Sequence, residues 1–301
     1  MDATRERETR RVAAVSVAGA VVLTLVKVWV GLSSGSLGIL AEAAHSGLDL
    51  VAAVMTLLAV HMSCRPADVE HTYGHGKVEN LSALFETLLL LATCVWIIHG
   101  AVERLVSGRS EIEVTVWAFL VMAFSIVVDV SRSRALYAAA RKHHSQALEA
   151  DALHFHTDIW SSSVVILGLA CVKLAEWLPG AGWLAHADAV AAILVALIVV
   201  QVSLQLGMRT VHALLDTAPA GMAQKIIAAA ESLPGVEDCH NVRLRYSGPR
   251  LFVDVHVLVD GGQTLRQAHE LTEEVERAIQ EVAPGADVTV HPEPAQPRQA
   301  G

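Results

Sequence analysis

Two short stretches of the sequence repeat one arrangement of acidic and histidine side chains. Each has an acid, a histidine three residues later and an aspartate four residues after that: Glu42, His45 and Asp49, then Asp151, His154 and Asp158. On a helix, residues four apart lie on one face, about 6 Å apart in height. Two imidazoles and two carboxylates from a pair of such helices suit tetrahedral Zn²⁺ and, less well, Co²⁺. The alternative is that these side chains form hydrogen-bonded pairs between helices.

Both stretches lie inside apolar segments. The chain has 301 residues, of which 53% are hydrophobic and 18% charged, and its mean hydropathy is +0.46. Six segments are long enough to cross a bilayer: residues 12–33, 37–62, 80–105, 112–137, 147–175 and 187–212. This pattern predicts a polytopic α-helical membrane protein with six transmembrane helices rather than a soluble enzyme. Because a carboxylate at mid-span costs about 2.5–3.5 kcal/mol to insert, we expect a bound dication or a partner to offset that cost.

Basic side chains gather on one side of these segments. Residues 1–11 contain four arginines, and the links after the second and fourth segments are also basic. The excess of Lys and Arg places these links and both termini in the cytoplasm of a multi-pass protein of the cell (inner) membrane. The expected divisions are a cytoplasmic segment over 1–11 and a transmembrane domain over 12–215. A formal net charge of -9 argues against a nucleic-acid partner, and four cysteines without a CxxC pair indicate reduced thiols.

After residue 216 the apolar runs give way to mixed charged sequence. A helix to about Leu233, strands at 240–246 and 251–259, a helix over 264–282 and a strand at 287–291 are predicted. This α-β-β-α-β order is typical of a small α+β domain, here over residues 216–293, followed by a tail over 294–301. Candidate ligands recur in it: His240, His256, His269, His291 and Glu293. His256 alternates with valines, so it could simply face solvent.

The link between the second and third segments reads "DVEHTYGHGK". It offers Asp68, His71 and His75, with two glycines that allow a tight backbone. Since three ligands on a short loop bind metal weakly without a fourth, a solvated polar loop is the alternative.

These motifs together resemble the cation diffusion facilitators, whose bacterial members exchange Zn²⁺ for protons. The resemblance rests on "GSLGILAEAAHSGLD" in the second segment, "HTYGHGKVE" after it and "ADALHFHTD" in the fifth, and it covers nearly the whole chain. It implies a transporter and not an enzyme. It also implies that the transport site consists of His45, Asp49, His154 and Asp158.

The resemblance carries further implications outside that site. It implies a second, more exposed metal site at Asp68, His71 and His75. It implies that the tail resembles a metallochaperone, forms a homodimer and binds zinc at His240, His256, His269, His291 and Glu293. The last of these ligands is often Asp in the family, so Glu293 is a departure. Lys77 and Asp216 would pair as a charge interlock of the dimer, although an unpaired surface lysine is as reasonable.

The expected function is secondary active export of Zn²⁺ from the cytoplasm in exchange for protons, with zinc at the tail as a regulatory ligand. Metal and protons would compete for one site, because histidine and carboxylate must be deprotonated to bind metal. Glu42 and Asp151 would attract ions along the access path, or would simply hydrogen-bond a neighbouring helix. The alternatives are a non-transporting zinc sensor or an exporter of Cd²⁺, Co²⁺, Fe²⁺ or Mn²⁺. Neither the His-Glu-x-x-His of metalloproteases nor the GxxxxGK[ST] of ATPases occurs.

Overall fold

The computed structural model describes residues 3–35, 37–107, 116–177 and 184–295, and these form two compact units. The first unit is Met1–Pro66 with Val78–Val211. The second is Ala67–Lys77 with His212–Gly301. The link between the second and third predicted segments therefore groups with the C-terminal part of the chain, not with the helices that it joins.

The first unit is a bundle of long helices. Their bounds are α1 Ala3–Ser34, α2 Leu37–Ser63, α3 Lys77–Ser107, α4 Val116–His143, α5 Gln146–Trp177 and α6 Leu184–Leu214. With 27 to 32 residues each, the helices are about 40–48 Å long, more than the roughly 30 Å of a hydrocarbon core. The first helix begins at Ala3, nine residues before the apolar segment expected over 12–33. Its charged N-terminal residues are good helix formers, and Glu6 and Arg10 pair four residues apart at 3.3 Å.

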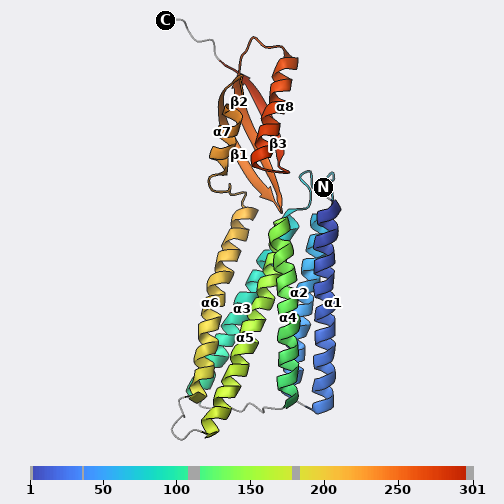
Figure 1. Cartoon of the computed structure of the whole chain (residues 1–301), viewed down its shortest axis with the longest axis vertical. Helices are drawn as coiled ribbons and strands as arrows, with labels where there is room; N and C mark the ends of the chain where they lie inside the picture. Colours follow the sequence, from blue (N-terminus) through green and yellow to red (C-terminus); the bar gives the residue numbers. More distant parts are fainter. Residues whose placement is uncertain (1–2, 36, 108–115, 178–183, 296–301) are drawn as a thin grey trace. The chain divides into compact units, whose positions relative to one another are not determined.

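Four helices pack closely around small side chains. α1 lies against α2 and α4, and α5 lies against α4 and α2 (Figure 1). The core between them places Leu136, Leu148 and Phe155 among alanines that include Ala13, Ala53, Ala139, Ala147 and Ala152. Small residues let helix backbones approach closely, which is the usual basis of packing in membranes. α3 and α6 meet where a Cβ on Gly207 would lie 3.0 Å from Thr87 Cγ2.

The outward faces of these helices are apolar. Leu25 and Trp29 on α1, Trp96 on α3 and Ile198 on α6 are all exposed. By length and composition, the described residues contain four helices that could cross a membrane: Thr4–Ser34, Glu42–Ser63, Lys77–Glu103 and Ile193–Leu214. α4 carries Asp129, Arg132 and Arg134, and α5 carries several acids, which lowers their hydropathy. The predicted count of six spans is therefore supported in four helices and stays a prediction for α4 and α5.

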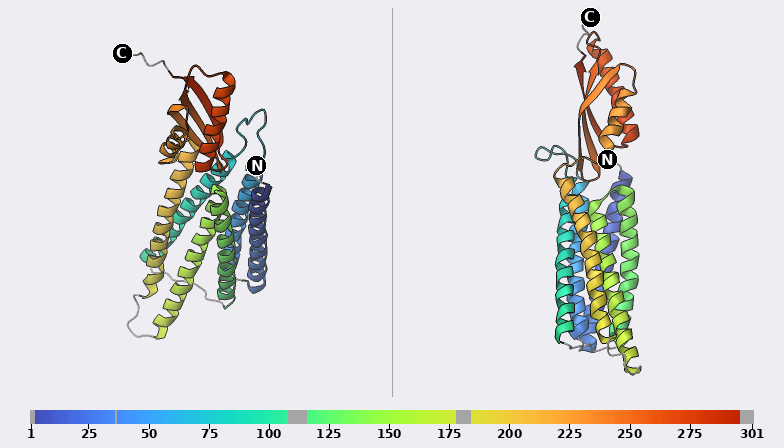
Figure 2. Two further views of the ribbon diagram at one scale, coloured as in Figure 1. Left: turned by 45° about the horizontal axis from the view of Figure 1, so that its top comes forward. Right: turned by 90° about the vertical axis from the view of Figure 1, so that its left-hand side faces the viewer.

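The second unit contains a three-stranded sheet. Its elements are α7 Met222–Glu231, β1 Val236–Ser247, β2 Arg250–Val259, α8 Leu265–Val282 and β3 Asp287–Pro294. The strand order is β1-β2-β3, with β2 antiparallel to β1 and parallel to β3. Both helices cover one face of the sheet (Figure 2). The predicted α-β-β-α-β order is confirmed, although β1 begins four residues earlier than expected.

The core of this unit follows from strand alternation and helix periodicity. Val253, Val255 and Val257 of β2 are fully buried against Ile226 of α7 and Ile279 of α8. α8 begins as predicted, because the Thr264 side chain accepts from the Gln267 N–H and Gln267 caps the Thr264 backbone in return.

Candidate metal centre

Side chains from α2 and α5 converge inside the helical bundle. His154 Nε2 lies 3.0 Å from Asp49 Oδ1 and 3.7 Å from Asp158 Oδ2. His45 Nε2 lies 3.9 Å from Asp49 Oδ1 and 3.8 Å from Asp158 Oδ1. Ligand atoms about 2.0–2.1 Å from a tetrahedral zinc are roughly 3.3–3.4 Å apart from one another. Three of the four predicted ligands, His45, Asp49 and Asp158, have ligand atoms within 4.8 Å of one another, and His154 adjoins them through the two aspartates.

The four side chains differ in their access to solvent. His154 is only 3% exposed, whereas His45 is 28% exposed, and the two aspartates lie between these values. Among the described residues, His154 Nδ1 is buried without a hydrogen-bond partner. Because two carboxylates share a largely buried space, the arrangement favours a dication or protons as occupants.

The acid before each histidine contacts α1. Glu42 is half exposed, and its Oε2 lies 3.1 Å from Lys27 Nζ. Asp151 is 1% exposed, and its Oδ2 accepts from Ser16 Oγ at 3.4 Å. Both contacts fit the alternative of hydrogen bonding to a neighbouring helix.

Several buried charges near these helices were not singled out in the sequence. Lys27 Nζ donates to Ser46 Oγ at 2.8 Å, and Arg132 lies 3.4 Å from Asp129 with its guanidinium stacked over the Phe155 ring. Glu86 on α3 is fully buried, and Thr56 donates to one of its oxygens. The signal that selects His45, an ionisable side chain inside an apolar segment, applies to these residues as well.

The loop before α3 brings its three candidate ligands together. Asp68 Oδ1 lies 3.2 Å from His71 Nδ1, and Asp68 Oδ2 lies 3.3 Å from His75 Nε2. Gly74 has a φ of 77°, which a glycine adopts without strain. The backbone N–H of His71, its main hydrogen-bond donor, lowers the pKa of the Asp68 carboxyl. Asp68 therefore stays ionised near neutral pH, as a metal ligand must.

Strand register gathers the tail histidines. His240 on β1 is opposite His256 on β2, and His256 is opposite His291 on β3. Glu293 lies among them, with Oε1 2.7 Å from His256 Nδ1 and 3.8 Å from His291 Nε2, and Oε2 3.4 Å from His240 Nε2. A hydrogen bond from His256 lowers the pKa of the Glu293 carboxyl.

Three further predicted residues lie elsewhere. His269 is 70% exposed on α8, where it faces Glu273 at 3.5 Å, so within one chain it is apart from the other tail histidines. Lys77 Nζ lies 2.8 Å from Asp216 Oδ1 and donates to the Leu214 carbonyl at 3.4 Å. Lys77 is thus paired within the chain.

Comparison with known proteins decides the family. Residues 13–215 match the family described as the cation efflux transmembrane domain. The chain belongs to the cation diffusion facilitator family. Residues 219–295 match the cytoplasmic domain of cation efflux proteins. As a family member with several long apolar helices, the chain is a multi-pass membrane protein and a cation efflux transporter.

Relatives match over nearly the full length. The cation-efflux pump FieF of Salmonella arizonae is 32% identical over 297 residues, which cover 98% of this chain and 95% of that protein. The protein of the same name from Serratia proteamaculans is 33% identical over 291 residues, covering 96% and 93%. Among solved structures, a nickel form of a MamM CTD variant is 29% identical and covers 26% of this family member and 100% of that chain, with a TM-score of 0.25.

Proposed function

We propose that the protein exports Zn²⁺ from the cytoplasm in exchange for protons, at a transport site made of His45, Asp49, His154 and Asp158. The observation that carries this proposal is the convergence of two imidazoles and two carboxylates between α2 and α5 at 3.0–3.9 Å. A set of two nitrogen and two oxygen ligands suits tetrahedral Zn²⁺. It suits Mg²⁺ and Mn²⁺ less well, because these ions prefer octahedral sites made of oxygen ligands.

Exchange follows from competition for the same atoms. A dication balances the charge of Asp49 and Asp158, and its departure would leave two neighbouring carboxylates uncompensated in a low-dielectric space. Protons from the outer side take its place and are released to the cytoplasm when the site faces inward. The proton gradient thereby drives zinc outward through alternating access to one site.

The topology that we propose has six spans and both termini in the cytoplasm of the inner membrane. The Lys and Arg bias supports it. α1 and α2, and likewise α4 and α5, are joined by very short links, so the members of each pair run antiparallel. In this orientation Glu42 lies on the outer side of the site and Asp151 on the cytoplasmic side, and we propose that they guide ions along the access path.

The loop and the tail are proposed as additional zinc sites of a homodimer. Asp68, His71 and His75 form the loop site, and His240, His256, His291 and Glu293 form the tail site, to which His269 contributes only if the assembly brings it closer. The ligand atoms of the loop group, and of His240, His256 and Glu293 in the tail, lie within 4.8 Å of one another. The Lys77–Asp216 pair would hold the start of α3 to the end of α6 as part of the charge interlock.

Zinc uptake into proteoliposomes tests the function. The full chain is reconstituted with a zinc-sensitive dye in the lumen, and zinc is added outside with the lumen acidic. We expect the dye to report zinc entry into the lumen, and we expect this signal to disappear when an ionophore collapses the pH gradient. Zinc uptake at the same rate with and without the pH gradient would exclude proton exchange. Absence of uptake of any metal would support the alternative of a non-transporting zinc sensor.

A second arm of the same experiment addresses the metal. Cd²⁺, Co²⁺, Fe²⁺ and Mn²⁺ are offered singly and in competition with Zn²⁺. The name cation-efflux pump borne by the relatives leaves the cargo open. Faster uptake of another metal than of zinc would replace zinc as the proposed cargo.

A further inference from the structure

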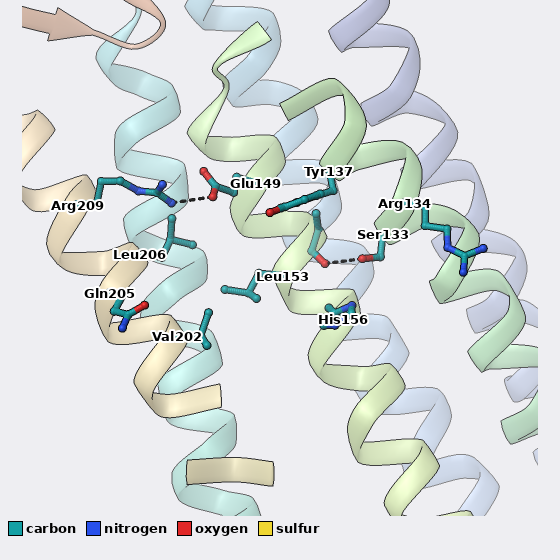
Figure 3. A pocket seen from close by; sticks show the side chains of 11 residues that line it. Ser133, Arg134, Tyr137, Glu149, Leu153, His156, Val202, Gln205, Leu206 and Arg209 are labelled. Atoms are coloured by element: carbon teal, nitrogen blue, oxygen red, sulfur yellow. Dashed lines mark hydrogen bonds and ion pairs between the residues drawn. The ribbon is translucent and has the colours of Figure 1, made fainter. Parts of the chain in front are cut away.

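A groove of about 670 Å³ lies between α4, α5 and α6, and none of the four predicted ligands lines it. Its size falls within the range of about 300–1,000 Å³ that is usual for small-molecule sites. Figure 3 shows Tyr137 and Arg209 reaching from opposite sides toward Glu149, with Leu153 and Leu206 below them. The groove therefore has a polar row near one end, and beyond it Leu153, Val202 and Leu206 line the groove together with the polar Gln205 and His156.

The charge of the groove favours an anion. Arg209 Nη2 lies 2.7 Å from Glu149 Oε1, so this pair is neutral overall, and a second arginine, Arg134, stands at the α4 rim. Two arginines against one glutamate leave a net positive charge. Arg209 keeps further N–H donors, and the Tyr137 hydroxyl can donate as well. A Zn²⁺ ion would be repelled here, which argues against the groove as a metal path.

The polar row lies at the depth of a lipid headgroup. α6 has 31 residues and is about 46 Å long, so a centred helix extends roughly 8 Å beyond each side of a 30 Å hydrocarbon core. Arg209 is five residues from the end of α6 at Leu214, or about 7 Å along the axis. Glu149 is three residues from the start of α5, at about the same depth. The apolar wall of Leu153, Val202 and Leu206 is level with the row or deeper.

We propose that this groove binds one anionic phospholipid of the leaflet at that end of the bundle. The phosphate would accept hydrogen bonds from Arg209 and Tyr137 near the positive rim, and an acyl chain would lie along Leu153, Val202 and Leu206. Basic pockets between membrane helices are known to hold anionic headgroups in this way. The arrangement would link α5, which carries His154 and Asp158, to α4 and α6 through a lipid.

Charge variants with opposite expected signs test the proposal. The purified full chain is mixed with detergent micelles that contain phosphatidylglycerol or phosphatidylcholine, and bound lipid is counted by native mass spectrometry. Arg209→Gln and Arg134→Gln should each lower phosphatidylglycerol affinity about fivefold, because one charge near an anionic lipid is worth about that factor. Glu149→Gln should raise affinity by a similar factor, since it frees Arg209. Arg7→Gln, an exposed arginine on α1 outside the groove, is the matched control.

The outcomes separate the sources of the phosphate. Wild-type protein should retain phosphatidylglycerol over phosphatidylcholine, and inorganic phosphate at the same concentration should not displace it. Equal retention of both lipids, or displacement by inorganic phosphate alone, would overturn the proposal. A fall in affinity with Glu149→Gln would also overturn the proposal. The expected rise is the informative result, because a misfolded variant cannot produce it. Displacement of the bound lipid by added Zn²⁺ would overturn the proposal and identify the groove as a metal path.

Discussion

At the scale of single residues, the proposed chemistry depends on a balance of charge in a small space. Asp49 and Asp158 supply the negative charge of the four-ligand site, and His45 and His154 supply the remaining ligand atoms. The apolar surroundings make each carboxylate costly unless a cation or proton accompanies it. Loss of one carboxylate therefore changes both the coordination and the charge that a dication meets.

Asp49→Ala or Asp158→Ala should abolish zinc transport while leaving the proposed homodimer intact. Each change removes one ligand and one of the two negative charges that balance the dication. Loss of a residue that only hydrogen-bonds to a metal ligand typically lowers metal affinity 10–100-fold, so loss of a ligand should cost at least as much. We expect flux in proteoliposomes to fall by at least about 100-fold, with no change in the elution volume of the purified protein. His99→Ala, an exposed histidine on α3, serves as the control and should transport normally. Robust flux from either aspartate variant would exclude the four-ligand assignment.

The thiol of Cys239 should react slowly in the folded protein. Burial, followed by the charges of Glu231 and Asp238, raises its pKa to about 11. The thiol is then protonated throughout the physiological range, and the reactive thiolate forms only as pH rises toward that value. Alkylation by iodoacetamide at pH 8, followed by peptide mapping, should be slow in native protein and fast in denaturant. Equal rates in both conditions would show that the side chain is accessible and the pKa unperturbed.

At the scale of elements, one short loop depends on a close backbone approach. Gly76 faces the hairpin between β1 and β2, where an added Cβ would clash with the Ser247 carbonyl oxygen. Nearby, the Tyr73 ring packs edge-on against Phe252. The Arg245 guanidinium lies 3.8 Å from the centroid of the Tyr73 ring. These contacts attach the loop that carries Asp68, His71 and His75 to the sheet.

Gly76→Ala should loosen this attachment. The added methyl group meets backbone, which cannot move aside cheaply, so we expect a cost of about 1–3 kcal/mol. Hydrogen exchange of residues 67–77 should become faster, and zinc binding by the loop should weaken. Gly262→Ala is the matched control in the same unit, because its nearest atom is the movable Asp260 carboxylate at 3.3 Å. Unchanged exchange in Gly76→Ala would mean that the loop and hairpin separate in solution.

At the scale of the whole molecule, the proposed transport site and the tail cluster belong to different units of the chain. The tail ligands come from three strands of one sheet, and the transport ligands come from two helices of the bundle. Mutations in the tail should therefore change the proposed regulation without removing the ligands that we propose carry zinc through the membrane.

His256→Ala combined with His291→Ala should weaken the response of the tail to zinc and leave some flux. Spin labels on the two tails of the proposed dimer would report their separation with and without zinc. In wild type we expect the distance to shorten with zinc, and in the double variant it should stop responding. His269→Ala should respond nearly as wild type does, since within one chain this side chain faces Glu273 and not the cluster. A double variant that closes normally would remove the regulatory role.

The sequence by itself determined the elements and much of the candidate site. Apolar runs predicted the long helices, alternation and turn residues predicted the α-β-β-α-β order, and the four-residue spacing placed His45 with Asp49 and His154 with Asp158. These features are local, because helix periodicity and strand alternation depend only on neighbours along the chain. The charged start of α1 shows the limit, since helix-forming residues continue the helix beyond the apolar run.

Tertiary structure alone decided which of these faces meet. The packing of α2 on α5 brings two stripes 105 residues apart to within 3.0 Å, as between Asp49 and His154. Register across the sheet gathers His240, His256 and His291 beside Glu293 and leaves His269 outside. Contacts of this kind depend on helix packing and strand pairing between distant segments, which no local periodicity specifies.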